Sequence, residues 1–194
     1  MDSSSQLYIP ILLGTIRQDR VSERIAKLLV RGIADRHPEI ETCLFDVRNM
    51  DLPHDDEGPD LAARNPEWRD AIIRADGLII VSPEYNHAFP GSLKRALDVL
   101  LKEYIHKAVG LCGVSASWVG GVRAIEGLVS VVRELGLTVT FTDLYFPHAG
   151  QTIDEDGTPH DAGVHGRVDD FMEELVWMAT VLKWGRESLQ SRYH

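Results

Sequence analysis

The chain has 194 residues, 44% of them hydrophobic, which is enough for one well-filled core and too few for two, so we predict a single domain over 1–194. Acidic residues outnumber basic ones by 30 to 20, and the net charge of −10 argues against a protein that binds nucleic acid by neutralising phosphates. Two distant cysteines, Cys43 and Cys112, argue against a disulfide framework, and no apolar run approaches membrane-spanning length, so we expect a cytoplasmic protein without membrane partners.

Apolar runs and amphipathic stretches alternate along the chain. The run LYIPILLG at 7–14 is typical of a strand buried on both faces, whereas 22–36 gathers its apolar residues on one helical stripe, with Ser22 standing where an N-cap could lie. The polar segment 1–6 is predicted to be disordered and 147–167 to be a surface loop. In chain order the predicted elements are strand 7–14, helix 22–36, strand 41–47, helix 65–76, strand 77–82, helix 90–104, strand 108–115, helix 122–135, strand 138–146 and helix 168–189.

Five alternations of strand and helix predict a parallel sheet, because parallel strands need crossover connections and helices supply them. The common order for five such units is 2-1-3-4-5. Ligands of these sheets bind beyond the carboxyl ends of the strands, at the switch point between strands 1 and 3. We therefore expect the binding site at the loops that follow 7–14 and 77–82.

The loop after the first strand, GTIRQDRVSERIA at 14–26, has the components of a phosphate site. Gly14 permits a sharp turn, Thr15 and Ser22 offer hydroxyls, Arg17 and Arg20 offer charge, and the next helix directs free N–H groups toward the loop. An ordinary strand-to-helix turn with surface arginines remains an equal alternative. The loop contains neither G-x-G-x-x-G nor G-x-x-x-x-G-K-[ST], which favours a mononucleotide over a dinucleotide or a P-loop ligand.

Taken together, the loops after strands 1 and 3 resemble a known family. LLGTIRQDRVSERIA and SPEYNHAFPGSLKRALD are similar to the NAD(P)H-dependent FMN reductase family, whose members show G-S-x-R and P-E-Y-N-x-x-x-P-G-x-L-K-N-A-I-D at these places. The resemblance in element order extends over essentially the whole chain and implies an α/β flavodoxin-like three-layer sandwich with a five-stranded parallel sheet in order 2-1-3-4-5. Thr15 replaces the usual serine and keeps a hydroxyl, while Arg95 and Leu97 replace Asn and Ile in the following helix.

The resemblance also implies a set of cofactor contacts. The residues expected at the FMN phosphate are Thr15, Arg17 and Ser22. Those expected along the isoalloxazine ring and ribityl chain are Pro83, Glu84, Tyr85 and Asn86. Those expected to let backbone approach the pyrimidine edge are Ser115, Gly120 and Gly121. A flavin ring has an apolar face and a hydrogen-bonding rim, so an aromatic side chain beside an amide suits it, although Glu84 is equally open to a role as a structural anchor.

The function implied by the resemblance is hydride transfer from NADPH or NADH through bound FMN to a small-molecule acceptor, by a ping-pong mechanism. The acceptor is a quinone, an azo compound, free flavin or a metal oxyanion, and the assembly is a homodimer or homotetramer. Because the flavin N5 carries the hydride, we assign no catalytic side chain, and we expect no metal site. Two alternatives remain open: an electron-carrier flavodoxin, whose T-x-T-G-x-T loop is absent here, and a flavin-free interaction protein on the same fold.

Several aromatic and histidine residues have more than one interpretation. Trp118 in the loop after strand 4 either covers the ring, meets a partner subunit or packs in the core. The apolar residues of the last helix, Trp177 and Trp184 among them, are interpreted as core or interface. Three histidines and an aspartate in 147–167 fit no familiar zinc pattern: His148, His160, Asp161 and His165.

Overall fold

The strands of the main sheet run parallel in the order β4-β2-β5-β6-β7. Strand β8 also pairs with β6, nearer the carboxyl end of β6 than β7 does. The computed structural model describes residues 6–52 and 61–193. The strands are β1 (Leu7–Tyr8), β2 (Ile11–Leu13), β3 (Ile40–Glu41), β4 (Leu44–Asp46), β5 (Gly77–Pro83), β6 (Ala108–Val114), β7 (Thr138–Val139) and β8 (Leu144–Phe146). Counting β1 with β2, β3 with β4 and β7 with β8, this is the predicted order 2-1-3-4-5.

Three of the predicted strands are interrupted, namely those at 7–14, 41–47 and 138–146. The first breaks at Pro10, which has no N–H to give to a ladder, and the separate pair β1–β3 precedes it. The last breaks between β7 and β8, where the Thr140 hydroxyl donates to the Thr142 carbonyl at 3.3 Å and Phe141 turns outward. The predicted strand ranges were therefore correct in position but too long as continuous ladders.

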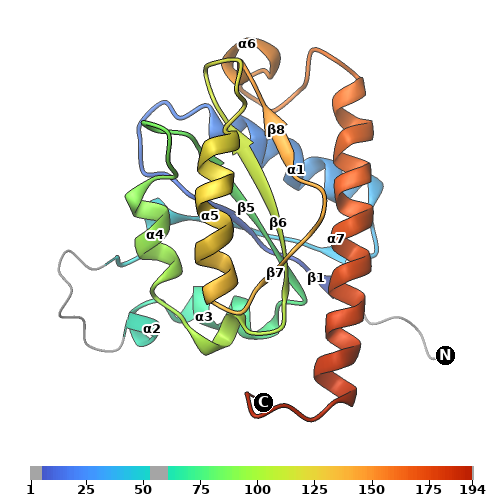
Figure 1. Ribbon diagram of the computed structural model, residues 1–194. Helices are drawn as coiled ribbons and strands as arrows, with labels where there is room; N and C mark the ends of the chain where they lie inside the picture. Colours follow the sequence, from blue (N-terminus) through green and yellow to red (C-terminus); the bar gives the residue numbers. More distant parts are fainter. Residues whose placement is uncertain (1–5, 53–60, 194) are drawn as a thin grey trace.

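Helices cover both faces of the sheet, as Figure 1 shows. They are α1 (Ser22–Arg36), α2 (Leu61–Arg64), α3 (Pro66–Arg74), α4 (Gly91–Leu97), α5 (Val122–Glu134), α6 (Ala149–Thr152) and α7 (Gly163–Ser188), with 3-10 turns η1 (Val47–Asn49) and η2 (Lys102–Tyr104). Helices α1 and α7 pack on one face, and α3, α4 and α5 pack on the other. The three-layer sandwich that the resemblance implied is therefore confirmed.

The core is divided by the sheet into two apolar clusters. Ile79 and Val81 of β5 face the cluster beneath α1 and α7, whereas Leu78 and Ile80 face the cluster beneath α3, α4 and α5. Successive side chains of a strand point to opposite faces, so a strand covered on both sides needs the continuous apolar run seen in the sequence. The buried sheet is the rigid base from which the loops at its carboxyl edge project.

Two predicted helices have different bounds in the structure. The helix predicted at 90–104 ends at Leu97, and it does not resume at Leu101, where the backbone is non-helical and the N–H donates to the Glu103 carboxylate at 3.1 Å. Helix α7 begins within the predicted loop 147–167, at Gly163, whose N–H is accepted by the Asp161 carboxylate at 2.9 Å. The bond at Leu101 takes an N–H that a longer helix would use, whereas the bond at Gly163 satisfies an N–H at a helix start, where no intrahelical acceptor exists.

The ends of the chain and its longest helix complete the description. The disorder predicted for 1–6 falls mostly outside the described residues, and Gln6 is placed, with its amide donating to the Pro38 carbonyl at 3.2 Å. No described helix has the length and the apolar character needed to cross a membrane. On α7, Trp177 and Trp184 are 61% and 59% exposed, so neither belongs to the core.

Candidate functional site

Three loops surround two adjoining hollows at the carboxyl edge of the sheet. Residues 14–21 follow β2, 84–90 follow β5 and 115–121 follow β6. One hollow, of about 540 Å³, lies between the first loop and the loops after β5 and β6, and the other, of about 730 Å³, lies between the first loop and the start of α4. Because α1 leaves β2 toward one face and α4 leaves β5 toward the other, the crevice opens at the predicted switch point.

The start of α1 provides an anion site in the smaller hollow. Val21 stands at the N-cap position and no side chain caps the helix, so the prediction that Ser22 is the cap was wrong. Ser22 is instead the first helical residue, and its buried Oγ has no hydrogen-bond partner within the described chain. The N–H groups of 18–22 likewise find no protein acceptor among the described residues. Uncapped N–H groups beside an unpartnered buried hydroxyl fit a phosphate.

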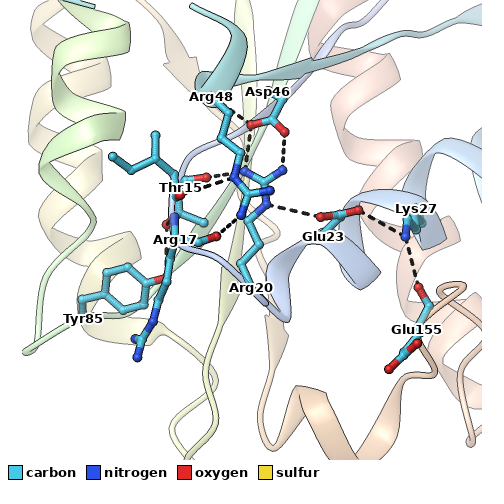
Figure 2. A network of polar contacts seen from close by, with 10 residues as sticks. Thr15, Arg17, Arg20, Glu23, Lys27, Asp46, Arg48, Tyr85 and Glu155 are labelled. Atoms are coloured by element: carbon cyan, nitrogen blue, oxygen red, sulfur yellow. Dashed lines mark hydrogen bonds and ion pairs between the residues drawn. The ribbon is translucent and has the colours of Figure 1, made fainter.

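Thr15 and Arg17 connect the first loop to the second (Figure 2). The Thr15 hydroxyl lies 3.1 Å from the Tyr85 hydroxyl and accepts the Arg17 N–H at 3.3 Å. The Arg17 guanidinium lies 5.3 Å from the centre of the Tyr85 ring, within the range of a cation–π contact. The structure thus brings three of the predicted site residues together at the boundary of the two hollows.

The second loop forms a tight hairpin that presents Tyr85 and Asn86. Tyr85 and Ala88 exchange backbone hydrogen bonds of 2.9 and 3.1 Å, and the two residues between them, Asn86 and His87, have φ values of +51° and +67°. Positive φ at both central positions is the geometry of a type I′ turn, for which Asn is a favoured residue. The turn holds Asn86 at the wall of the larger hollow. Pro83, the last residue of β5, lines the smaller hollow.

The Glu84 carboxylate ties the second loop to the first turn of α5, which follows the third loop. It is nearly buried and accepts from the Arg123 Nε at 2.6 Å and from the Arg123 backbone N–H at 3.2 Å. Of the two roles left open for Glu84, these contacts support the structural anchor. Sequence reasoning missed Arg123, although a basic residue two positions after Gly121, at the start of a predicted helix, was an available signal.

The third loop is closed by its own polar groups. The Ser115 Oγ accepts the Gly120 N–H at 2.9 Å and donates to the Ser117 carbonyl at 2.8 Å. Gly120 and Gly121 have φ values of +74° and +95°, and a Cβ on Gly121 would lie 2.5 Å from the Val114 nitrogen. Gly121 is therefore required by packing on β6, and Gly120 by its contact with Tyr145 and Pro147, while their approach to a pyrimidine edge stays a prediction.

Two residues near the site differ from their sequence interpretations. Gly14 is needed for space and not for a special turn, because a Cβ there would lie 2.9 Å from Leu93 of α4. Trp118 is 79% exposed on the third loop, which excludes core packing and leaves the ring cover and the subunit contact open.

Arg20 lines the smaller hollow, but its charge is already paired. Its guanidinium donates to the Asp46 carboxylate at 2.7 Å and to the Thr15 carbonyl. Burial raises the pKa of Asp46, yet hydrogen bonds from Arg20 and from the Arg48 N–H outweigh it, so the pKa lies below its usual value. Sequence reasoning considered Arg20 as a source of charge and missed both Asp46 and Arg48.

The histidines of 147–167 have separate contacts. His148 Nδ1 lies 3.2 Å from the Ala116 carbonyl, and His160 Nε2 lies 2.9 Å from the Asp154 carboxylate. Across residues 6–52 and 61–193, no three metal-ligating side chains converge.

Comparison with known proteins gives the family. Residues 7–151 match the model of the family described as NADPH-dependent FMN reductase. A 2-hydroxy-1,4-benzoquinone reductase from a Burkholderia species is 26% identical over 177 residues, covering 88% of this chain and 94% of that protein. An NADPH azoreductase from Bacillus sp. (strain OY1-2) is 32% identical over 126 residues, covering 63% of this chain and 66% of that protein.

Among solved structures, FerB from Paracoccus denitrificans, a flavoenzyme NAD(P)H:(acceptor) oxidoreductase, has a similar fold. Its TM-score is 0.73 at 24% identity, with 89% of this chain and 98% of that chain covered. The family model, by contrast, matches the sequence itself from β1 to α6, including all three loops of the site. The chain therefore belongs to the NADPH-dependent FMN reductase family of flavin-dependent oxidoreductases.

Proposed function

We propose that this chain, as one FMN-binding domain over 1–194, transfers hydride from NAD(P)H through FMN to a quinone or an azo compound. The observation that carries the proposal is the uncapped start of α1, where N–H groups and the Ser22 hydroxyl, none of them with a partner among residues 6–52 and 61–193, lie next to a hollow bordered by Tyr85. The named activities of the quinone and azo reductases to which the chain is similar support the choice of acceptor.

The residues of the site divide between the two ends of FMN. The Ser22 hydroxyl and the N–H groups of 18–22 would donate to the phosphate, and the exposed Arg17 would add positive charge beside it. Tyr85, held by Thr15, and the rigid turn that carries Asn86 would border the ring. Preorganised loops of this kind bind a flat ligand without a large ordering cost.

FMN, when bound, accepts a hydride from the nicotinamide and passes electrons to the acceptor. The chain contributes orientation: the larger hollow, bordered by Tyr85, Asn86, Phe89 and Arg95, is a single open space beside the proposed ring position. If the nicotinamide and the acceptor use this space in turn, a ping-pong mechanism follows. None of the contacts described requires a side chain to act as general acid or base.

The proposal also includes a homodimer or homotetramer in the cytoplasm. Large apolar side chains that the chain leaves exposed support self-association, namely Trp118, Phe141, Trp177 and Trp184. Both cysteines are free thiols, which suits a reducing compartment.

The test is spectroscopic. Purified protein is reconstituted with FMN, desalted and titrated anaerobically with NADPH and then NADH, while the visible flavin band is recorded. Retained flavin that bleaches with a nicotinamide and recovers when benzoquinone or an azo dye is added supports the proposal, as do parallel double-reciprocal lines. Flavin that is reduced by dithionite but by neither nicotinamide would indicate an electron carrier instead. Loss of all flavin on desalting would contradict the cofactor assignment for this chain.

A further inference from the structure

We propose that Arg20, Arg48 and Asp46 form a carbonyl clamp that makes the flavin site selective for the phosphorylated cofactor without touching the phosphate. This inference rests on the proposed binding of FMN. It concerns the first loop, beside which these three residues lie together (Figure 2); Arg20 also lines the smaller hollow, whereas Asp46 and Arg48 line neither hollow.

Arg20 is the buried member of the carbonyl clamp. Its side chain is 3% exposed, its guanidinium pairs with both oxygens of Asp46, and the same group donates to the Thr15 carbonyl. Its Nε also lies 3.4 Å from the Glu23 carboxylate in the first turn of α1. Two neighbouring carboxylates neutralise the positive charge of this guanidinium, so Arg20 is unsuited to direct phosphate binding.

Arg48 extends the carbonyl clamp along the loop. Its Nε donates to the Ile16 carbonyl at 3.3 Å and its Nη2 donates to the Arg17 carbonyl. Together with the Arg20 contact, two guanidiniums bind the carbonyl oxygens of three successive residues, 15 to 17. These three carbonyls are therefore held by guanidinium groups and not turned freely toward an incoming anion.

Asp46 holds both arginines in place. It ends β4, and the register that pairs it with Leu13 of β2 sets its carboxylate beside the first loop. One carboxylate oxygen accepts from Arg20 and also accepts the Arg48 N–H at 2.9 Å, which caps the short helix η1. The carboxylate thus orients one guanidinium directly and the other through the backbone that carries it.

The consequence of the carbonyl clamp is a polarity difference across one loop. A phosphate dianion is repelled by carbonyl oxygens and attracted by N–H groups. The carbonyls of 15 to 17 are already bound by Arg20 and Arg48. The residues that follow, 18–22, have N–H groups without an acceptor in the described part of the chain. Arg20, Arg48 and Asp46 are in this sense positioning residues.

Arg24 offers a matched control on the same helix. It also donates to two backbone carbonyls, that of Ile153 at 2.8 Å and that of Gly150 in α6 at 3.4 Å, and neither of these residues lines either hollow. Arg24→Ala therefore removes a similar set of carbonyl contacts from α1 without altering the first loop.

The experiment compares FMN with riboflavin, which lacks the phosphate. Dissociation constants for both flavins are measured by fluorescence quenching on apo protein, for wild type, Arg20→Gln, Arg48→Ala and Arg24→Ala, together with urea unfolding. We expect FMN affinity to fall about tenfold in Arg20→Gln and about threefold in Arg48→Ala, with riboflavin affinity changed less than about twofold. Arg24→Ala should keep the wild-type ratio of the two affinities.

The outcomes separate the carbonyl clamp from the cofactor assignment. If wild type prefers FMN and both clamp variants keep that preference, or lose both flavins equally, the clamp is overturned and the FMN site stands. If wild type itself does not prefer FMN, the phosphate site and the clamp fail together. Arg48 is exposed, so its variant is expected to fold and decides the question even if Arg20→Gln does not.

Discussion

The two edges of the sheet each contain a carboxylate with two basic partners, and they use it differently. At the carboxyl edge, Asp46 holds Arg20 and Arg48. At the amino edge, Asp76 accepts from Lys183 at 3.1 Å and from Arg186 at 2.8 Å. Both arrangements connect segments distant in sequence. Asp76 directly precedes β5, and Asp46 ends β4 beside the loop that follows β2.

The difference lies in what each arrangement leaves unsatisfied. At the amino edge, Asp76 also accepts the Tyr8 N–H, Arg186 also donates to the His106 carbonyl, and Lys107 donates to the Ala75 carbonyl. Donors and acceptors there satisfy one another. At the carboxyl edge the arginines bind carboxylates and carbonyls, so the N–H groups of 18–22 and the Ser22 hydroxyl remain without partners in the described part of the chain. The contacts at the amino edge stabilise the fold, and the unsatisfied groups at the carboxyl edge are available to bind a ligand.

The largest expected effect comes from breaking the amino edge. Asp76→Ala leaves Lys183 and Arg186 partly buried without a carboxylate, which should cost about 3 kcal/mol in the free energy of unfolding. FMN affinity, measured by flavin titration, should stay within about twofold because the site lies at the opposite edge. The exposed pair Arg36–Asp169 is the control, and Asp169→Ala should cost less than about 1 kcal/mol. A large loss of FMN affinity with intact stability would contradict the division between the two edges.

An intermediate effect is expected from pH. Burial, assisted by the nearby charge of Arg186, lowers the pKa of Lys107 to about 8, whereas an unfolded lysine titrates near about 10.4. Between these values the unfolded chain binds more protons, so the free energy of unfolding should rise with pH, by roughly 2–3 kcal/mol over the window.

The measurement is urea unfolding at pH 7.5 to 10.5 for wild type and Lys107→Met, with Lys94→Met on the exposed face of α4 as control. Buried tyrosines and Cys112 titrate with the opposite sign, so the difference between wild type and variant is the quantity to follow. Parallel pH profiles for wild type and Lys107→Met would show that this lysine does not titrate in the window.

The smallest effect sharpens the contrast at the carboxyl edge. Ser22→Ala removes a buried hydroxyl that has no partner in the described chain, so the apo protein should unfold at the same urea concentration or at a slightly higher one. FMN affinity should fall about tenfold, because a hydrogen bond to a charged group contributes about 1.5 kcal/mol or more. Equal losses of stability and of affinity would mean that the hydroxyl serves the fold.

Most of the architecture could be predicted because it depends on local patterns. Alternating apolar runs and amphipathic stretches give the strand and helix order, and α1 was predicted with its observed bounds, 22–36. The site residues Thr15, Arg17 and Tyr85 were predicted from two loop motifs and are brought together in the structure. The end of α4 and the start of α7 were missed, because side-chain hydrogen bonds near both places leave no periodic signal in the sequence.

The sequence alone determined which face of each element is apolar, the order of the strands and the loops that carry the site, because each follows from periodicity or from a short motif. The tertiary structure decided the partners of the charges. Arg20 meets Asp46 only through the pairing of β2 with β4, and Glu84 meets Arg123 across 39 positions in sequence. The sequence does not distinguish an arginine that binds a ligand from one that binds a carbonyl, because only the packed sheet determines which acceptor lies within reach.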